Sequence, residues 1–222
     1  MWYKKILIGG TCVPACHYDI NRDGYPVTEE ERVCFKNPTQ KELYPPLNHY
    51  DAASAVRIMA TENPHNRNTF RIRPAEDGDI ASLLALETSC FARIEEQFNR
   101  RQILRLISNP RAIVVVAERK RVAMGWAAGL LRYYRQHHAG RIYAVAVHPD
   151  AQGKRIGHKL TDHILHTLAA HGAKRIFLEV HAENQKAINL YHKLGFIVQG
   201  HLADYYGAGH HGIRMMRPTL QR

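Results

Sequence analysis

Residues 178–196 read LEVHAENQKAINLYHKLGF, a stretch that predicts a strand followed at once by a helix. The apolar run at its start is typical of a strand, which we place over Gly172–His181. The segment AINLYHKL has the apolar spacing of a helix, which we place over Asn184–Leu194. Asn184 is also a residue type that caps helix N-termini. Another strand is expected to begin at Phe196–Gln199.

A second informative stretch, Ala151–Leu160, reads AQGKRIGHKL. It follows a predicted strand at Arg141–Pro149 and opens a predicted helix at Ile156–His171. Backbone N–H groups in such a loop bind phosphate oxygens, assisted by the positive end of the helix. The two glycines alone are weak evidence, because a helix start without a ligand explains them equally well. Arg155 stands where glycine is frequent, and we expect its side chain to point outwards, without a positive φ.

The rest of the sequence from residue 70 onwards completes an α/β pattern. Its predicted order is β-α-α-β-β-β-α-β-α-β-β, which gives a mixed sheet with helices on both faces. The further predicted segments are a strand from Phe70, helices from Gly78–Asp79 and over Gln97–Ile107, strands over Ala112–Glu118 and Val122–Leu131, and a last strand near Gly212–Arg217.

Together the two stretches resemble the GNAT family of acyl-CoA-dependent N-acetyltransferases, and within it the RimI-like ribosomal-protein-alanine N-acetyltransferases. The resemblance rests on LEV, Asn184, Leu190-Tyr191 and Leu194-Gly195-Phe196, at the right distance from the loop. It covers about residues 70–219 as one GNAT domain and implies direct acetyl transfer from acetyl-CoA to a primary amine. Residues 1–69 are an extension of unknown role.

The resemblance implies a cofactor site for the acetyl-CoA co-substrate in three places. Backbone N–H groups of the loop would bind the pyrophosphate, and the strand before it would pair with the pantetheine arm. Asn184 would hydrogen-bond the cofactor, although capping the helix explains it too. The implied residues are Gln152, Gly153, Lys154, Arg155, Ile156 and Gly157 in the loop, and Val145, Ala146 and Val147 in the strand.

Glu179 and Tyr191 occupy the positions that the family pattern gives to the general base and to the acid for the departing sulfur. A base is needed because a free α-amino group, with a pKa of about 8, is mostly protonated at neutral pH. A phenol is a reasonable acid for a thiolate, since their pKa values lie close together. Two alternatives remain, a solvated strand position for Glu179 and a core aromatic for Tyr191.

On the acceptor side, Tyr205 and Tyr206 resemble the family's tyrosine-bearing loop beside the peptide N-terminus. The acidic residues that usually follow are replaced by His210 and His211, so the acceptor stays open. Glu95-Glu96 is a candidate contact for a basic acceptor, or a solvated helix start. A protein N-terminus, with ribosomal proteins as one option, is favoured over a small amine or aminoacyl-tRNA. A non-catalytic acyl-CoA- or RNA-binding module is the alternative of another class, and it would have no need of both Glu179 and Tyr191.

Charge and composition set the remaining expectations. The whole net charge of +11 falls on residues 70–222, since residues 1–69 carry eight basic and eight acidic groups. A basic domain favours anionic partners, a nucleotide cofactor or RNA among them. No apolar run approaches a membrane span or a signal sequence, so we expect a cytoplasmic protein with no membrane contact.

Residues 1–69 contain two weak metal patterns. Asp19–Glu30, DINRDGYPVTEE, fits a calcium loop in spacing, but Pro26 and the flanks argue for an ordinary turn. Cys12, Cys16 and His17 lack the second close pair of a structural zinc site. The histidines of the domain do not have the spacing of a standard metal site either. We therefore expect no metal site.

Overall fold

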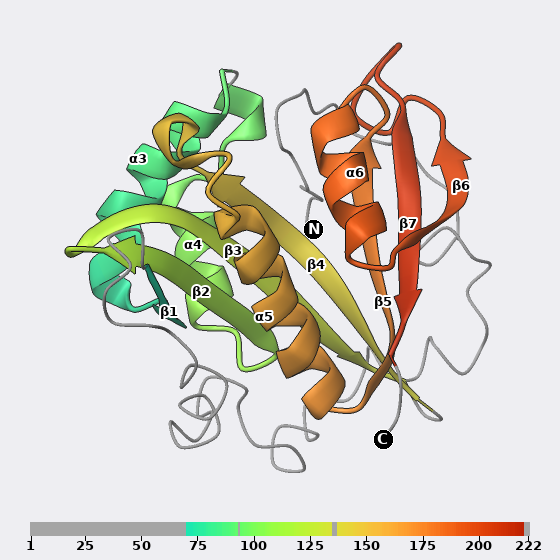
Figure 1. Cartoon of the computed structure of the whole chain (residues 1–222), viewed down its shortest axis with the longest axis horizontal. Coiled ribbons are helices and arrows are strands. Elements are labelled where there is room, and N and C mark those ends of the chain that lie inside the picture. The colour runs from blue at the N-terminus through green and yellow to red at the C-terminus, as the bar shows by residue number, and fades with distance from the viewer. Residues whose placement is uncertain (1–69, 93, 135–136, 220–222) are drawn as a thin grey trace.

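The computed structural model describes residues 70–219, apart from residue 93 and residues 135–136. A seven-stranded sheet runs through this part in the order β1-β2-β3-β4-β5-β7-β6 (Figure 1). Only β4 and β5 are parallel, and the other neighbours are antiparallel. The strands are β1 Arg71–Pro74, β2 Ala112–Arg119, β3 Val122–Tyr133, β4 His138–Val147, β5 Ala173–His181, β6 Ile197–Leu202 and β7 Gly212–Pro218.

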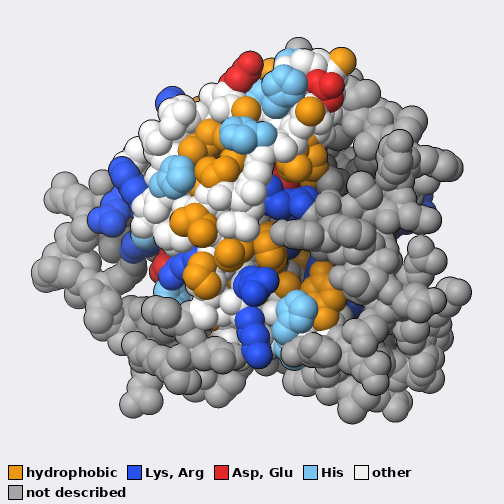
Figure 2. Space-filling model, turned by 90° about the vertical axis from the view of Figure 1, so that its right-hand side faces the viewer, with side chains coloured by type: hydrophobic (Ala, Val, Ile, Leu, Met, Phe, Trp, Pro, Cys, Tyr) orange, Lys and Arg blue, Asp and Glu red, His pale blue; other side chains and the backbone are white. Residues whose placement is uncertain are grey.

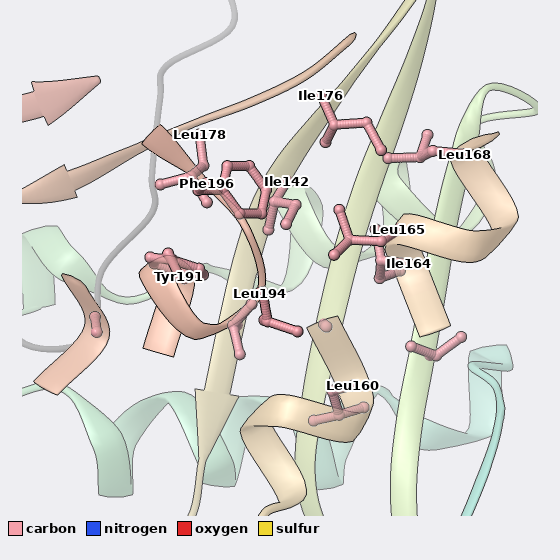
Figure 3. Packing of buried hydrophobic residues seen from close by; sticks show 14 of the residues in the cluster. Ile142, Leu160, Ile164, Leu165, Leu168, Ile176, Leu178, Tyr191, Leu194 and Phe196 are labelled. Carbon is pink, nitrogen blue, oxygen red and sulfur yellow. The ribbon is translucent and has the colours of Figure 1, made fainter. Parts of the chain in front are cut away.

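Helices cover both faces of the sheet, as the sequence predicted. On one face α5 and α6 enclose a core that includes Leu160, Ile164, Leu178 and Phe196 (Figure 3). On the other face α3 and α4 pack around the buried indole of Trp126. The helices in the described part are α3 Ile80–Cys90, α4 Arg100–Ile107, α5 Ile156–Ala170 and α6 Gln185–Lys193, with the short 3-10 turns η2 Asp77–Asp79, η3 Ile94–Glu96 and η4 Pro149–Ala151.

The predicted elements are all present, with some shifted ends. Helix α4 begins at Arg100 rather than Gln97, because Asn99 forms a capping box in which its side chain accepts from Gln102 N at 3.0 Å. Strand β4 begins at His138, three residues before the predicted start, and pairs there with Tyr133 of β3. The first shift follows from a cap inside the predicted segment, and the second from pairing with a residue beyond the predicted end of β3.

The two central parallel strands, β4 and β5, diverge halfway along their length. Pairing between β4 and β5 covers only His138–Arg141 against Ala173–Phe177. Beyond that point Figure 1 shows the two strands diverging towards the ends that carry Val147 and His181. Tyr143 sits at a bulge where the β3–β4 register shifts, which adds local twist to β4 at the same level. The diverging halves bring the two predicted motifs to the same end of the sheet.

Several expectations fall outside the described residues. They are the calcium loop at Asp19–Glu30, the Cys12, Cys16 and His17 cluster, and the extension over residues 1–69 as a whole. Within residues 70–219, the structure contains no helix that combines the length and apolarity needed to cross a membrane.

Candidate active site

The predicted phosphate loop lies directly after β4, and its residues are exposed. Gln152, Gly153, Lys154 and Arg155 form an open turn between η4 and α5, with Gly153 and Arg155 at φ +76° and +61°. The Gln152 side chain donates to Val147 O at 3.2 Å, and the Lys154 ammonium donates to Asp150 O at 2.7 Å. Left-handed residues in such a turn expose successive N–H groups as an anion-binding concavity at the helix N-terminus.

Arg155 confirms one expectation and corrects another. Its side chain is exposed, as predicted, so it does not fill the loop. Its backbone, however, is left-handed, with φ +61° and ψ 13°, at the N-cap position of α5. The loop therefore needs the conformation that favours glycine, and Arg155 adopts it at a cost of about 1–2 kcal/mol. The sequence could not show this, because it does not report backbone angles.

Two substitutions at Arg155 separate the effect of its left-handed backbone from the effect of its side-chain charge. Arg155→Gly removes the left-handed strain, so we expect the free energy of unfolding to stay the same or rise by up to about 1 kcal/mol. Arg155→Ala keeps the strain and serves as the matched control. Both variants lose the same charge, so coenzyme A affinity should fall equally in both, and more at low salt. Urea unfolding and calorimetric titration measure the two effects; a less stable glycine variant would contradict the strain.

Glu179 lies near the end of β5 on the face opposite Leu178 and Val180, as strand alternation predicted. That face is not solvated there, since Glu179 is only 1% exposed. Its Oε2 accepts a short bond from Arg141 of β4, and its Oε1 accepts from Nε and Nη2 of Arg214 at 3.3 and 3.2 Å. Both oxygens are therefore already engaged by buried guanidinium groups.

Two tyrosines of the predicted acceptor loop adjoin this ion pair. Arg141 Nη2 also donates to Tyr205 Oη at 3.2 Å, and Tyr205 packs edge-on against Tyr206 with ring centroids 4.9 Å apart. Burial raises the pKa of both phenols, and the nearby Glu179 charge raises them further. Both rings therefore stay protonated as neutral hydrogen-bonding groups. The structure thus brings Tyr205 and Tyr206 together with Glu179, from segments far apart in the sequence.

Tyr191 lies on α6 in the core of the opposite face, against Phe196 at 5.8 Å between ring centroids. It is fully buried, and its hydroxyl has no hydrogen-bond partner among the described residues. A buried hydroxyl without a partner costs about 1–3 kcal/mol. Burial also raises the pKa of this phenol, which keeps the proton on the oxygen. The group is a proton donor with no acceptor among the residues that the structure describes.

Arg141 links the predicted base to the tyrosines of the acceptor loop where β4 and β5 diverge. The Tyr191 phenol acts electrostatically on Tyr206, although the two rings belong to different cores. Arg141, the last β4 residue paired with β5, stands at the point of divergence. Glu179 and Tyr205 are therefore linked through Arg141 where the two strands diverge, and the exposed loop follows the end of β4.

The other predicted cofactor residues lie in β4 and at the starts of α5 and α6. Val145 and Ala146 are buried, and Val147 ends β4 opposite Gly125. Asn184 caps α6, since its Oδ1 accepts from Ala187 N at 3.0 Å, which confirms the capping alternative. Ile156 and Gly157 form the first turn of α5, where Ile156 is buried.

Cys90, at the end of α3, is close to β4 but is not set up as a nucleophile. Its thiol donates to Val147 O at 3.3 Å. Burial, and then the Glu87 charge, raises the pKa of Cys90 to about 11, so the thiolate is scarce at neutral pH. The structure gives no support to an acyl-cysteine intermediate at this position.

Sequence reasoning missed three buried neighbours of the predicted residues: Arg141 and Arg214 at Glu179, and His181 against Tyr206. Each lies in a strand, and each is buried. Charged or polar residues inside predicted strands are the signal that could have singled them out, because they need buried partners. Which partners they have depends on register, and Arg214 faces Glu179 directly across β7 and β5. Burial also lowers the pKa of the His181 imidazole, which favours its neutral form.

Comparison with known proteins agrees with this geometry. The model of the Acetyltransferase (GNAT) family matches residues 80–196, which include the divergent strands, the loop and Tyr191. The chain belongs to the GNAT family. The fold expected from the sequence is confirmed, and members of this family are acetyltransferases that use acetyl-CoA.

Two solved GNAT structures show the same fold over about two thirds of this chain. The ribosomal-protein-S18-alanine N-acetyltransferase of Escherichia coli is 22% identical with a TM-score of 0.59, covering 69% of this chain and 96% of that one. The Salmonella typhimurium protein yncA, solved with its cofactor acetyl-CoA, is 20% identical with a TM-score of 0.58, at the same coverage of 69% and 96%.

A curated GNAT relative is similar over a shorter segment. Mycothiol acetyltransferase from Mycobacteroides abscessus is 46% identical over 59 residues, which are 27% of this chain and 20% of that protein. The chain thus spans about a fifth of the length of this relative. Similarity of this kind supports the family and leaves the acceptor open.

The residues around the opening fit acetyl-CoA on structural grounds. The exposed turn with Gly153 and Arg155 offers N–H groups to a pyrophosphate, and Lys154 adds positive charge beside it. The buried Tyr191 hydroxyl, which has no partner within the described part of the chain, would be able to donate to a ligand atom. These features sit at the two sides of the diverging strands.

Proposed function

We propose that the chain transfers the acetyl group of acetyl-CoA to the α-amino group of a protein or peptide N-terminus, as RimI-like members of the family do. The observation that carries the proposal is the hydrogen-bonded group of Glu179, Arg141 and Tyr205 where β4 and β5 diverge, together with the buried Tyr191 hydroxyl, which has no partner among the described residues. Acetyl-CoA supplies the acetyl group as a thioester, whose C–S bond breaks as the amine nitrogen bonds to the acetyl carbon.

Tyr191 is assigned to the sulfur side of the reaction. Its hydroxyl keeps its proton at neutral pH and has no protein acceptor among the described residues. It is therefore poised to give that proton to the leaving thiolate. The deprotonated phenol would be short-lived in its apolar surroundings, so it recovers the proton quickly.

Glu179 is assigned to the amine side, under a constraint that the geometry adds. Because Arg141 and Arg214 donate to both of its oxygens, Glu179 can take the amine proton only by exchanging one of these bonds. A water molecule between amine and carboxylate lets the exchange occur without moving the buried strand. Through Arg141, Glu179 also fixes the Tyr205 hydroxyl beside the acceptor.

The acceptor class is proposed from the tyrosines and from the neighbouring structures. Tyr205 and Tyr206 give a wall of aromatic rings next to Glu179, which suits the backbone of a peptide. The name of the Escherichia coli neighbour specifies a ribosomal protein alanine. The net charge of +11 favours a ribosomal or RNA-rich setting in the cytoplasm. A small amine is the second candidate, because the mycothiol acetyltransferase match reaches 46% identity.

Thiol release from acetyl-CoA, measured with a panel of acceptors, tests the proposal. We expect turnover with peptides that have a free N-terminus and none with the same peptides blocked at that amine. Turnover confined to small amines or to aminoacyl-tRNA would show that the acceptor is one of these and not a peptide N-terminus. Coenzyme A binding without turnover of any amine would favour the non-catalytic module. Mass spectrometry of cellular protein N-termini, with and without this chain, would then identify the natural acceptors.

A further inference from the structure

Three residues outside the proposed transfer chemistry bring metal-binding atoms together. His181 ends β5, Glu183 follows it before α6, and His210 lies in the loop between β6 and β7. Their ligand atoms all lie within 4.8 Å of one another. We propose that His181, Glu183 and His210 bind a transition-metal ion such as Zn²⁺. Two imidazoles and a carboxylate form a zinc ligand set that leaves a fourth position open.

The first ligand is held rigidly by the fold. His181 is buried, and its ring stacks on Tyr206 with centroids 5.3 Å apart. Its Nδ1 accepts from Glu183 N at 3.2 Å and lies 3.9 Å from Glu183 Oε2. The Nδ1 lone pair therefore accepts from the backbone amide, and a metal ion bound at Nδ1 would replace this one long hydrogen bond. Little conformational entropy has to be lost at this residue.

The second histidine is positioned by backbone bonds in its own loop. Tyr206 N donates to His210 O at 3.0 Å, and His210 N donates to Gly207 O at 2.8 Å. The loop is tied to the end of β5 because Ala182 N donates to His211 O at 2.9 Å. As a result the His210 ring lies 5.6 Å from the His181 ring, between centroids. Two histidines 29 positions apart in sequence are thus held side by side.

The surroundings favour a cation. Glu183 is mostly exposed, at 80%, and is free to turn towards the histidines at little cost. The buried Glu96 of η3 also acts electrostatically on His181, while His210 and His211 act in the opposite direction. In Figure 2 histidine and acidic side chains gather at the upper end of the molecule, where Figure 1 places the loop between β6 and β7. The spacing of these three residues along the sequence could not reveal that they lie together. They are brought together when β7 pairs with β5.

Cobalt(II) titration of the full chain, without a histidine tag and after chelator treatment, tests the proposal. We expect visible absorption bands of a four- or five-coordinate ion, saturating at one Co²⁺ per chain and displaced by Zn²⁺. His181→Gln and His210→Gln should each weaken binding at least about 10- to 100-fold. Glu183→Gln should weaken it less, and His201→Gln, on the exposed part of β6, should leave it unchanged.

Two outcomes would overturn the site. One is the absence of saturable Co²⁺ binding in the unaltered chain. The other is binding that survives in His210→Gln but disappears in Cys12→Ser/Cys16→Ser, which would place the ion at the N-terminal cysteines. Thermal unfolding of each variant, without metal, shows that a lost signal does not come from a lost fold. His210 lies on a half-buried loop position, so its variant is the one expected to keep the fold intact.

Discussion

Tyr191→Phe is expected to lower kcat by roughly 100- to 10,000-fold while leaving the protein at least as stable as before. The kinetic loss follows because the phenol proton no longer reaches the leaving sulfur. Stability is preserved because the substitution removes a buried hydroxyl without a described partner, and the ring with its Phe196 contact remains. Steady-state thiol release and thermal unfolding measure the two quantities in the same preparation.

A second tyrosine serves as the control for the Tyr191→Phe experiment. Tyr133→Phe, at the end of β3, removes a hydroxyl from a half-buried ring away from the opening, and should leave kcat unchanged. An unchanged kcat in Tyr191→Phe would show that Tyr191 is only a core aromatic. A strong loss of stability would show that its hydroxyl has a structural partner after all.

Glu179→Gln is expected to reduce the free energy of unfolding by about 3–5 kcal/mol, besides lowering activity. The reason is that Arg141 and Arg214 would remain buried without the carboxylate that neutralises them. Urea unfolding measures the loss. Arg214→Met provides the comparison, because it removes one guanidinium and leaves Glu179 paired with Arg141.

The double variant Glu179→Gln/Arg214→Met separates the base from the ion pair. We expect it to regain part of the lost stability and none of the lost activity, because the proton acceptor is still absent. If activity returns together with stability, Glu179 acts only by holding the arginines in place, and the base assignment is wrong. Peptide KM reports separately on Tyr205, which Arg141 positions.

The fold was largely predictable because its strong signals are local. Continuous apolar runs marked β2 and β4, and the helix of LEVHAENQKAINLYHKLGF was found within a residue or two. Strand alternation correctly placed Glu179 opposite Leu178. The divergence of β4 from β5 could not be predicted in this way, because it depends on pairing between segments more than 30 residues apart.

The contacts of the candidate site residues could not be predicted from the sequence. Glu179 was expected to be available as a base, and the structure instead shows both of its oxygens bonded to arginines. Arg155 was expected in an unstrained loop, and the loop proved left-handed at that position. In each case the missing information is three-dimensional: a partner from β4 or β7, and a backbone angle. Sequence patterns identify residue types and leave such neighbours undefined.

Hydrogen exchange of the full chain, with and without acetyl-CoA, tests the central claim that the co-substrate occupies the opening between β4 and β5. The account predicts that amides of residues 152–157, exposed in the free protein at Gly153 and Arg155, become strongly protected, together with those at the end of β4. Residues of β1 and β6, which lie at the two edges of the sheet, should be unaffected. Unchanged exchange over residues 152–157 at saturating acetyl-CoA would contradict the account.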